Sequence, residues 1–223
     1  MRGLLKLTIG LVALVGLLAG ADRIAVGVAE DEAADRLASG GRMAQPPSVH
    51  IEGFPFLTQA LAGEFDEVRL SGEGMTVGDG KEQVALRSFS ARLSGVAVGD
   101  GYRSATVRSG SGSGLISYAD AARLVPGAER LELSYGGPGK IKASVMGVSI
   151  GQGDVHSKGN TITADGFRLT GVASLLKGRA ASLLGPRSFT LTELPAGLNL
   201  AAAVPQPDGL QLSFSGEHVE LIG

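Results

Sequence analysis

Residues with the spacing of an acyl-transfer site occur once in the chain, at Ser174 and Lys177. In this Ser-x-x-Lys pattern the lysine amine can take the proton of the serine hydroxyl and so turn it into a nucleophile. Enzymes that use the pair also carry Ser-Asp-Asn and Lys-Thr-Gly elements, and the sequence contains neither. Because two defined positions arise often by chance, an ordinary amphipathic helix explains this segment better than an active site does.

Other catalytic and metal-binding patterns are missing from the sequence. It has no phosphate-binding glycine loop and no His-Glu-x-x-His. It also has no cysteine, which excludes disulfides, thiolate metal sites, a cysteine nucleophile and a lipoprotein anchor. His50, His156 and His218 each lack a partner at metal-ligand spacing. We therefore predict no catalytic residues, no metal site and no cofactor, although carboxylate pairs for glycoside hydrolysis are not excluded by spacing alone.

Composition and charge exclude another class of function. The formal net charge is −2, and lysine and arginine are scattered without interleaved aromatic residues, so we predict no nucleic-acid partner. Hydrophobic residues make up 43% of the chain but aromatic residues only 4%, so the core must be built mainly from Leu, Val, Ile and Ala.

The amino terminus has the features of an export signal. Arg2 and Lys6 precede LTIGLVALVGLLAGA, a run of 15 residues without charge. That length suits the apolar core of a signal peptide and falls short of the roughly 20 residues of a membrane-spanning helix. Residues 19–21, Ala-Gly-Ala, would suit cleavage, while an uncleaved membrane anchor is the alternative, because helical spacing continues beyond them. In either case the positive flank stays inside, and we expect residues 22–223 to be extracytoplasmic, secreted or anchored to the outer face of the plasma membrane.

From Val49 onward the apolar residues recur with period two, which is typical of strands with one dry and one polar face. Glycines within these strands would let a sheet bend. Hairpin turns are predicted at four Asp-Gly pairs: Asp79-Gly80, Asp100-Gly101, Asp165-Gly166 and Asp208-Gly209. We predict an α+β fold in which a long, strongly curved antiparallel β-sheet, a meander, wraps around short helices and follows an N-terminal helix.

Three short helices should interrupt the strands: FLTQALAG from Phe56, SYADAARLV with Ser117 as N-cap, and GVASLLKGRAASLLG between Gly171 and Gly185. The third carries two leucine pairs eight residues apart, which places them on one side of a helix. The run SGSGSG around Gly112 is too short for an interdomain linker. The prediction is therefore a leader or anchor over residues 1–21 and a single domain over residues 22–223.

The stretch Gly53 to Thr58, GFPFLT, concentrates two of the seven phenylalanines and a proline at one corner. It could form a hydrophobic staple, in which both rings pack on the sheet and Pro55 sets the direction of the first helix. The staple is the favoured interpretation, but the stretch could also contact a ligand, since rings that fill a gap between sheet and helix also line any cavity there.

The segment IEGFPFLTQALAGEFDEVRLSG resembles the signature of the actinobacterial LmeA family of exported phospholipid-binding proteins. Similarity extends from the lead-in AEDEAADRL to the closing LPAGLNLAAAVPQPDGLQLSFSGEHVEL. The resemblance implies a non-catalytic protein that holds phospholipid, inositol phospholipids among them, outside the plasma membrane. It also implies a fold similar to the tubular lipid-binding (TULIP) proteins, with an acyl-chain slot between a bent sheet and helices.

From these patterns we predict phospholipid binding, or phospholipid transfer, that serves the lipids or lipoglycans of the cell envelope. Acyl chains in an apolar slot would gain about 0.8 kcal/mol per buried methylene without covalent chemistry. The predicted lining comes from the first helix corner and from the third helix: Phe54, Phe56, Leu57, Leu61, Leu175, Leu176, Leu183 and Leu184. The alternatives are an extracytoplasmic serine hydrolase or transferase acting on envelope esters or glycans, and a membrane-tethered adaptor.

Overall fold

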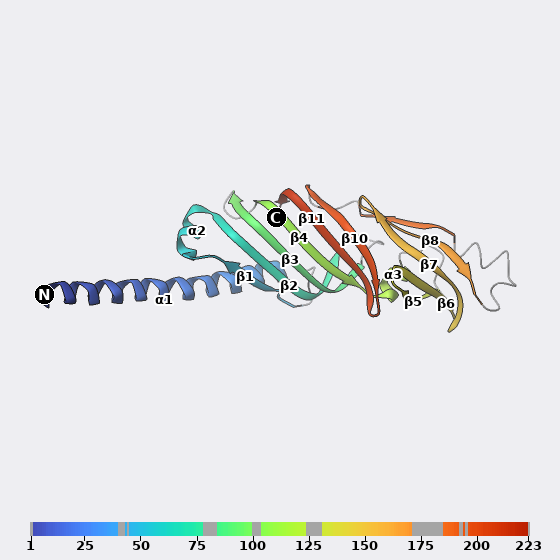
Figure 1. The fold of residues 1–223 in the computed structure, drawn as a ribbon, viewed down its shortest axis with the longest axis horizontal. Coiled ribbons are helices and arrows are strands. Elements are labelled where there is room, and N and C mark those ends of the chain that lie inside the picture. Colours follow the sequence, from blue (N-terminus) through green and yellow to red (C-terminus); the bar gives the residue numbers. More distant parts are fainter. Residues whose placement is uncertain are drawn as a thin grey trace.

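The computed structural model describes residues 2–39, 43, 45–77, 84–99, 104–123, 131–170, 185–191, 194 and 196–222. Within these ranges, helices and strands follow in the order α1 (Arg2–Ser39), β1 (Ser48–Glu52), α2 (Phe56–Ala62), β2 (Glu64–Val77), β3 (Val84–Gly99), β4 (Ser104–Ile116), α3 (Tyr118–Arg123), β5 (Leu131–Gly137), β6 (Lys140–Val145), β7 (Val148–Lys158), β8 (Thr161–Leu169), β9 (Arg187–Thr190), β10 (Leu198–Gln206) and β11 (Gly209–Ile222). The molecule is elongated, with α1 projecting from one end of the strands (Figure 1).

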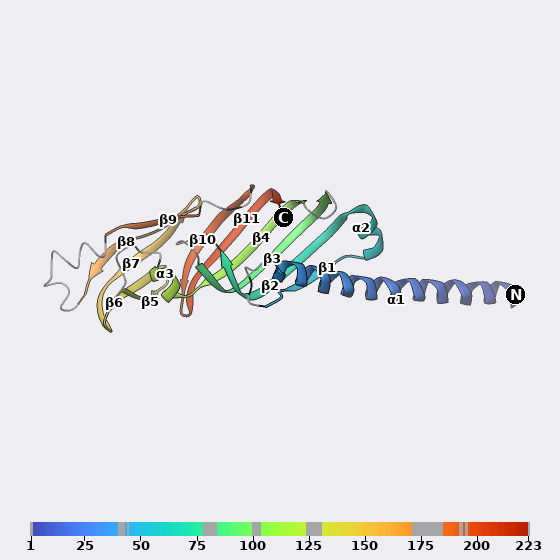
Figure 2. The same cartoon turned by 180° about the vertical axis from the view of Figure 1, so that it is seen from behind.

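The strands form two antiparallel sheets, with the orders β1-β2-β3-β4-β11-β10 and β5-β6-β7-β8-β9. They follow one another along the long axis, and β10 of the first sheet contacts β5 and β7 of the second (Figure 2). Antiparallel strands, short helices and an N-terminal helix were predicted, and these features are confirmed. One strongly curved sheet wrapped around the helices was also predicted, and this is wrong. The sheet is interrupted because the chain leaves β4 through α3 and begins a new ladder at β5, while the hairpin β10–β11 returns to pair with β4.

The core consists of two apolar clusters on one face of the six-stranded sheet. In the first, Val26 of α1 and Phe56 of α2 pack against Phe65, Val107 and Val219 of the strands. The second lies nearer the junction of the sheets and is built around Leu86, Ile116, Leu200 and Leu212, with Ile162 of β8 packed against it. The five-stranded sheet therefore shares part of its apolar surface with the first sheet.

In the first sheet, the alternation between inward-facing and outward-facing residues shifts by one residue at the same level of four neighbouring strands, β2, β3, β4 and β11. Phe65, Val96, Val107 and Val219 point into the core, and the next inward residues of the same strands come three positions away, as at Val68 and Leu93. Two consecutive residues of each strand therefore face the outer side of the sheet. The ones directly beside the four inward residues form an outer row: Asp66, Gly95, Arg108 and His218. The backbone change is visible in positive φ values, 62° at Gly95 and 52° at His218. The pairing register of the strands is the same on both sides of this row. All four strands therefore shift together, and residues that would face outward by strict alternation face the core beyond it.

The predicted turns have different outcomes. Asp208-Gly209 joins β10 to β11, and Ser117 caps α3 by accepting a hydrogen bond from the Asp120 amide at 3.1 Å, so both predictions are confirmed. The Asp165-Gly166 turn is wrong, because this pair lies inside β8, where Gly166 has φ 61° at an irregularity opposite Asp154. Asp79-Gly80, Asp100-Gly101 and the predicted third helix lie outside the described residues.

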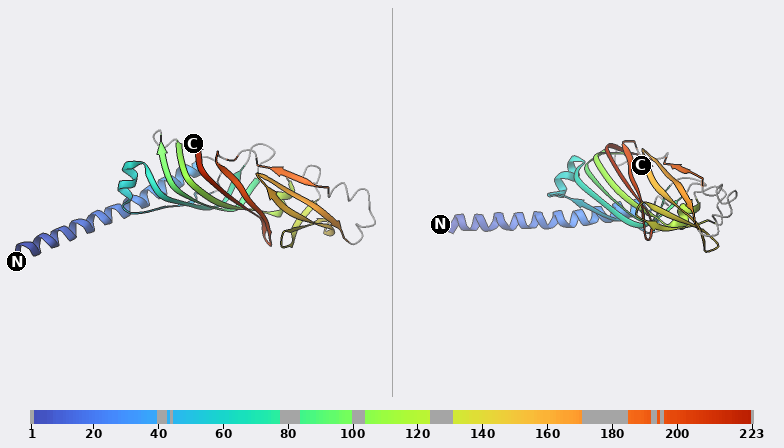
Figure 3. Two further views of the ribbon diagram at one scale, coloured as in Figure 1. Left: turned by 45° about the horizontal axis from the view of Figure 1, so that its top comes forward. Right: turned by 45° about the vertical axis from the view of Figure 1, so that its right-hand side comes forward.

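Helix α1 is 38 residues long and runs without a break through the predicted cleavage site at residues 19–21. Among the residues that the structure describes, no helix is sufficiently long and apolar to cross a membrane. The second half of α1 lies along the edge strand β1, where the Glu30 carboxylate accepts a hydrogen bond from the Ile51 amide at 2.7 Å. Helix α1 is thus fastened to the sheet from the region of Asp22 onward, and its first part extends beyond it (Figure 3).

Candidate functional site

The stretch that stood out in the sequence forms a compact corner between β1 and β2, which we call the α2 corner (residues 53–63). The peptide bond between Phe54 and Pro55 is cis, Pro55 precedes α2, and Thr58 donates a hydrogen bond from its hydroxyl to the Pro55 carbonyl at 2.8 Å. Gly63 ends the helix in the left-handed region, with φ 69°. Such an ending favours glycine because a Cβ is strained at that φ.

The two rings of the corner have opposite environments. Phe56 is buried, with 5% of its surface exposed, and its ring stacks on Phe65 with 6.2 Å between the centroids. Phe54 is 65% exposed, and the Arg23 guanidinium of α1 lies 5.4 Å from the centre of its ring. Residues two apart around a short helix start point in different directions, so one ring holds the corner to the core and the other faces solvent.

Asp22 fixes the corner to α1. Its side chain is almost completely buried, and the carboxylate accepts hydrogen bonds from the Leu57 amide at 2.8 Å and from Arg23 at 2.6 Å. Burial acts to raise the pKa of Asp22, but the hydrogen bonds from Arg23 and from the Leu57 and Phe56 amides outweigh it and leave the pKa below 3.8. The carboxylate is therefore ionised at neutral pH, and it accepts hydrogen bonds from backbone N–H groups at the start of α2 that have no acceptor within the helix.

Replacing Asp22 with alanine should loosen α2 from α1, seen as faster hydrogen exchange at the Leu57 amide and a lower Tm. A carboxylate whose pKa is lowered by folding stabilises the protein fully above its unfolded pKa, and this contribution is lost as the pH falls through the lower folded value. The Tm difference between Asp22→Ala and the unmodified protein should therefore shrink below about pH 3.8. Asp31→Ala, at an exposed position of the same helix, is the matched control. A Tm difference that persisted unchanged at low pH would contradict this role.

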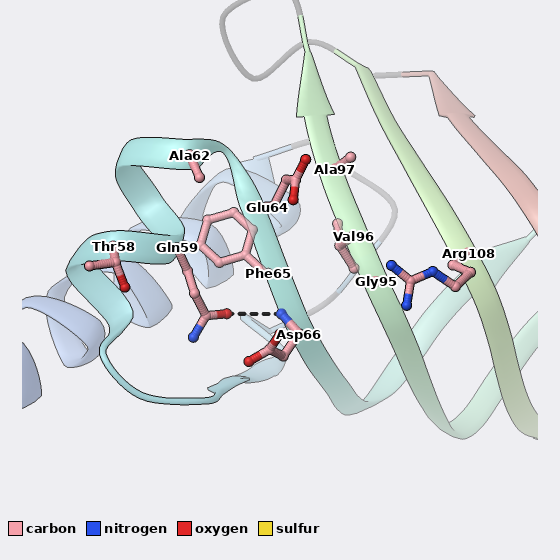
Figure 4. Close-up of a pocket in the computed structure, with 10 residues that line it drawn as sticks. All are labelled: Thr58, Gln59, Ala62, Glu64, Phe65, Asp66, Gly95, Val96, Ala97 and Arg108. Atoms are coloured by element: carbon pink, nitrogen blue, oxygen red, sulfur yellow. Dashed lines mark hydrogen bonds between the residues drawn. The ribbon is translucent and has the colours of Figure 1, made fainter.

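A cleft of about 390 Å³ lies between α2 and the neighbouring strands (Figure 4). Gln59 of α2 accepts a hydrogen bond from the Asp66 amide at 2.8 Å. Asp66 lies in the part of β2 that has no pairing residue in β1, so the Gln59 side chain binds the amide that a neighbouring strand would otherwise bind. The Nε2 atom of Gln59 is buried without a hydrogen-bond partner among the described residues. The carboxylates of Glu64 and Asp66 also face the cleft.

Arg108 reaches this cleft across β3. Its guanidinium lies over Gly95, where an added Cβ would come within 3.0 Å of Cζ, so a glycine is required beneath it. Within the described part of the chain, no carboxylate or carbonyl pairs with Arg108. A guanidinium can hold an anionic oxygen by two hydrogen bonds. With two carboxylates beside it, the cleft suits a small polar or zwitterionic group and does not suit an acyl chain.

An apolar surface of a different kind lies on the core-facing side of β4. The run SGSGSG forms the middle of this strand, and the serines point outward while Gly110, Gly112 and Gly114 point inward; we call these three residues the β4 glycine face. Leu93, Ala91 and Phe89 of β3 pair with them on one side. Gly216, Phe214 and Leu212 of β11 pair with them on the other. Residues paired across strands share a face. The β4 glycine face thus has no side chains of its own, and the leucines Leu93 and Leu86 lie against its two end glycines, Gly110 and Gly114.

The rings beside the β4 glycine face are only partly covered. Phe89 and Phe214 are half-buried, and both lie at the edge of the second core cluster, while Leu93 belongs to the edge of the first. The outer side of the same strands is polar, with a hydrogen bond of 3.0 Å between the hydroxyls of Ser90 and Ser113. Only the inner side could therefore receive a hydrocarbon chain.

Of the eight residues predicted to line a lipid slot, the structure describes the four at the α2 corner. Phe56 belongs to the core, whereas Phe54, Leu57 and Leu61 are exposed on the α2 corner, with 65%, 41% and 90% of their surfaces accessible. Leu175, Leu176, Leu183 and Leu184 lie outside the described residues, as do Ser174 and Lys177. The β4 glycine face was not among the predicted residues, although the strict alternation of serine and glycine was a signal for it.

Comparison with known proteins identifies one family. The model of the LmeA-like phospholipid-binding family matches residues 20–215, which is most of the chain. No curated protein and no solved structure gives a significant match.

Proposed function

The chain belongs to the LmeA-like phospholipid-binding family, and on that premise we propose that it binds phospholipid without catalysis and holds the acyl chains against the β4 glycine face. The family match is the observation that carries the function, since the family is named for phospholipid binding and not for a reaction. The structure supplies the reason for choosing this location.

A strip of glycines gives an acyl chain room close to the backbone. Gly112 offers the most space, because only the Ser90 carbonyl and Ala91 lie within 4 Å of an added Cβ there, whereas the side chains of Leu93 and Leu86 lie against Gly110 and Gly114. The neighbouring Phe89 and Phe214 offer apolar walls. Removing hydrocarbon from water gives about 0.8 kcal/mol per methylene, so a single chain of ordinary length would supply most of the affinity. This argument supports lipid binding through the chains and leaves headgroup selection, including inositol phospholipids, to other contacts.

The proposal also covers the cellular location of the protein and the use of the bound lipid. We propose that residues 22–223 lie outside the plasma membrane, with the first 21 residues acting as a signal peptide or anchor, and that the bound lipid serves the cell envelope. The uncharged run after Arg2 and Lys6 supports this placement. Protease added to intact spheroplasts should digest the sheets, and a fully protected chain would contradict the placement.

Gentle purification of the full chain should recover bound phospholipid, detectable by native mass spectrometry and by lipid extraction. Protein stripped of lipid should regain it from phospholipid vesicles. The headgroups of the extracted lipids would show whether inositol phospholipids are preferred. A folded protein that carries no phospholipid and takes none up would refute the proposed function.

A further inference from the structure

The α2 corner presents three large apolar side chains to solvent. Phe54, Leu57 and Leu61 are 65%, 41% and 90% exposed, and the two leucines lie four positions apart on one side of α2. Fully burying one such side chain is worth about 1.5–3 kcal/mol relative to leaving it in water. Exposed apolar groups of this size, gathered on one short element, indicate a surface that is covered in the working protein.

The corner is held rigidly in this exposed position. Asp22 binds the Leu57 amide, and Arg23 donates a hydrogen bond to the Gly53 carbonyl at 3.3 Å while its guanidinium lies over the Phe54 ring. Phe56 anchors the other side of the corner in the core. The apolar side chains therefore cannot turn inward without breaking contacts that attach α2 to α1 and to the sheet.

The position of the corner along α1 identifies what covers it. The uncharged run of α1 ends just before Asp22 and Arg23, and both of these residues contact the corner. On the other side of that point, Val15, Leu17 and Leu18 are all exposed, and α1 extends away from the sheets (Figures 1 and 3). Consecutive residues point to different sides of a helix, so this part of α1 is apolar all round, as in a helix surrounded by lipid.

We infer that the α2 corner docks into the interface of a lipid bilayer, with Phe54, Leu57 and Leu61 inserted beside the point where α1 leaves the sheets. This inference rests on the proposed placement at the membrane and adds the surface that makes the contact. The bilayer is the occupant because the exposed apolar surface of the corner adjoins the apolar part of α1, in which Val15, Leu17 and Leu18 are exposed.

Arg23 and Phe54 are residue types that suit the boundary between the headgroups and the acyl chains of a membrane. Aromatic rings are enriched at the boundary between headgroups and acyl chains, and arginine there keeps its charge near the phosphates while its stem lies along apolar groups. The contact between the Arg23 guanidinium and the Phe54 ring presents both groups together. Docking in this way would bring the strands that follow α2 close to the lipid surface.

The chain has no tryptophan, so a single introduced tryptophan reports on one position without background. We propose three full-length variants: Phe54→Trp at the corner, Val15→Trp in the apolar part of α1, and Val148→Trp at an exposed apolar position of β7 in the other sheet. Each would be reconstituted with mixed phosphatidylcholine and phosphatidylglycerol vesicles, with or without lipids brominated near the headgroup end of the chains. Emission wavelength and quenching by the bromine are the readouts.

Docking predicts that Phe54→Trp is blue-shifted by vesicles and loses about half or more of its emission to brominated lipid, as expected for insertion by 5–10 Å. Val148→Trp should show neither change. Adding Leu61→Asp to Phe54→Trp should weaken the quenching, since a charge at the most exposed apolar position opposes insertion. Leu61→Asp should leave the circular dichroism spectrum unchanged, because the Leu61 side chain is 90% exposed.

Three results would overturn the inference. In the first, Val15→Trp is quenched while Phe54→Trp behaves like Val148→Trp, so that α1 alone inserts. In the second, none of the variants responds to vesicles. In the third, Phe54→Trp is already blue-shifted without vesicles, so that a second copy or another protein covers the corner. Lipid extraction decides the proposed function separately, because phospholipid could be recovered from a protein whose corner stays in water.

Discussion

Replacing Gly112 with leucine should lower the amount of phospholipid recovered with the purified protein at least about tenfold, because the new side chain occupies the middle of the β4 glycine face. A tenfold loss corresponds to 1.4 kcal/mol, less than the contribution of two acyl methylenes at about 0.8 kcal/mol each. An added Cβ would lie 3.2 Å from the Ser90 carbonyl oxygen, which is a tight contact, and 3.8 Å from the Ala91 Cβ, which is an ordinary one. The Ser90 carbonyl must therefore move by a few tenths of an ångström, and the free energy of unfolding measures the cost of that shift.

Ser111→Leu is the matched control for this variant. Ser111 adjoins Gly112 in the same strand, but it is exposed on the outer side of the sheet. Both variants should keep the free energy of unfolding within about 1–3 kcal/mol of the unmodified protein, and only Gly112→Leu should lose lipid. Mass spectrometry of the extracted lipid measures the difference. If folded Gly112→Leu retained its phospholipid, the acyl chains would have to lie elsewhere.

Replacing Phe56 with alanine should have the largest effect on stability of the changes considered. The ring is 5% exposed, stacks on Phe65 and joins α2 to the first core cluster with Val26. Removing a buried phenylalanine ring costs about 3–5 kcal/mol, from lost burial and from the cavity left behind. Urea unfolding followed by far-ultraviolet circular dichroism would measure this loss.

Phe54→Ala provides the contrast, two positions away. The Phe54 ring is mostly exposed, and its interaction with Arg23 is worth about 0.5–1 kcal/mol at such a site. The free energy of unfolding should therefore fall by no more than about 1 kcal/mol. Equal destabilisation by the two alanine variants would contradict the opposite environments of the two rings.

Two apolar features of the described chain have separate tasks in this account. The β4 glycine face would hold the acyl chains on the inner side of the sheet, and the α2 corner would hold the protein against the membrane that supplies them. They are linked by the first core cluster, in which Phe56 of the corner and Leu93 beside Gly110 both take part. The polar cleft at Arg108 includes none of the three glycines of the β4 glycine face, but Thr58, Gln59 and Ala62 of the α2 corner line one side of it.

Much of the local structure was predictable from the sequence. Period-two alternation predicted antiparallel strands, Ser117 marked the start of α3, and Asp208-Gly209 marked the last hairpin. The block from Gly53 to Thr58 predicted both the corner and the family. These features depend on residues close together in the chain, whose side-chain period, capping groups and turn preferences act over a few positions.

The partition into two sheets needed the tertiary structure, because alternation shows that a segment is a strand without showing its partners. The exchange of faces at the row through Gly95 and Arg108 is likewise set by four neighbouring strands together. In the sequence it leaves only a Ser-Gly pair between Leu93 and Val96, where the period-two pattern slips by one residue.

The sequence alone determined that this chain has strands, a helical corner rich in apolar residues and an uncharged amino-terminal run. Only the tertiary structure decided that Phe56 is core while Phe54 faces solvent, and that the buried carboxylate of Asp22 binds an amide 35 positions away. The physical reason is that burial and long-range hydrogen bonds depend on which surfaces meet, and residues distant in the chain bring those surfaces together.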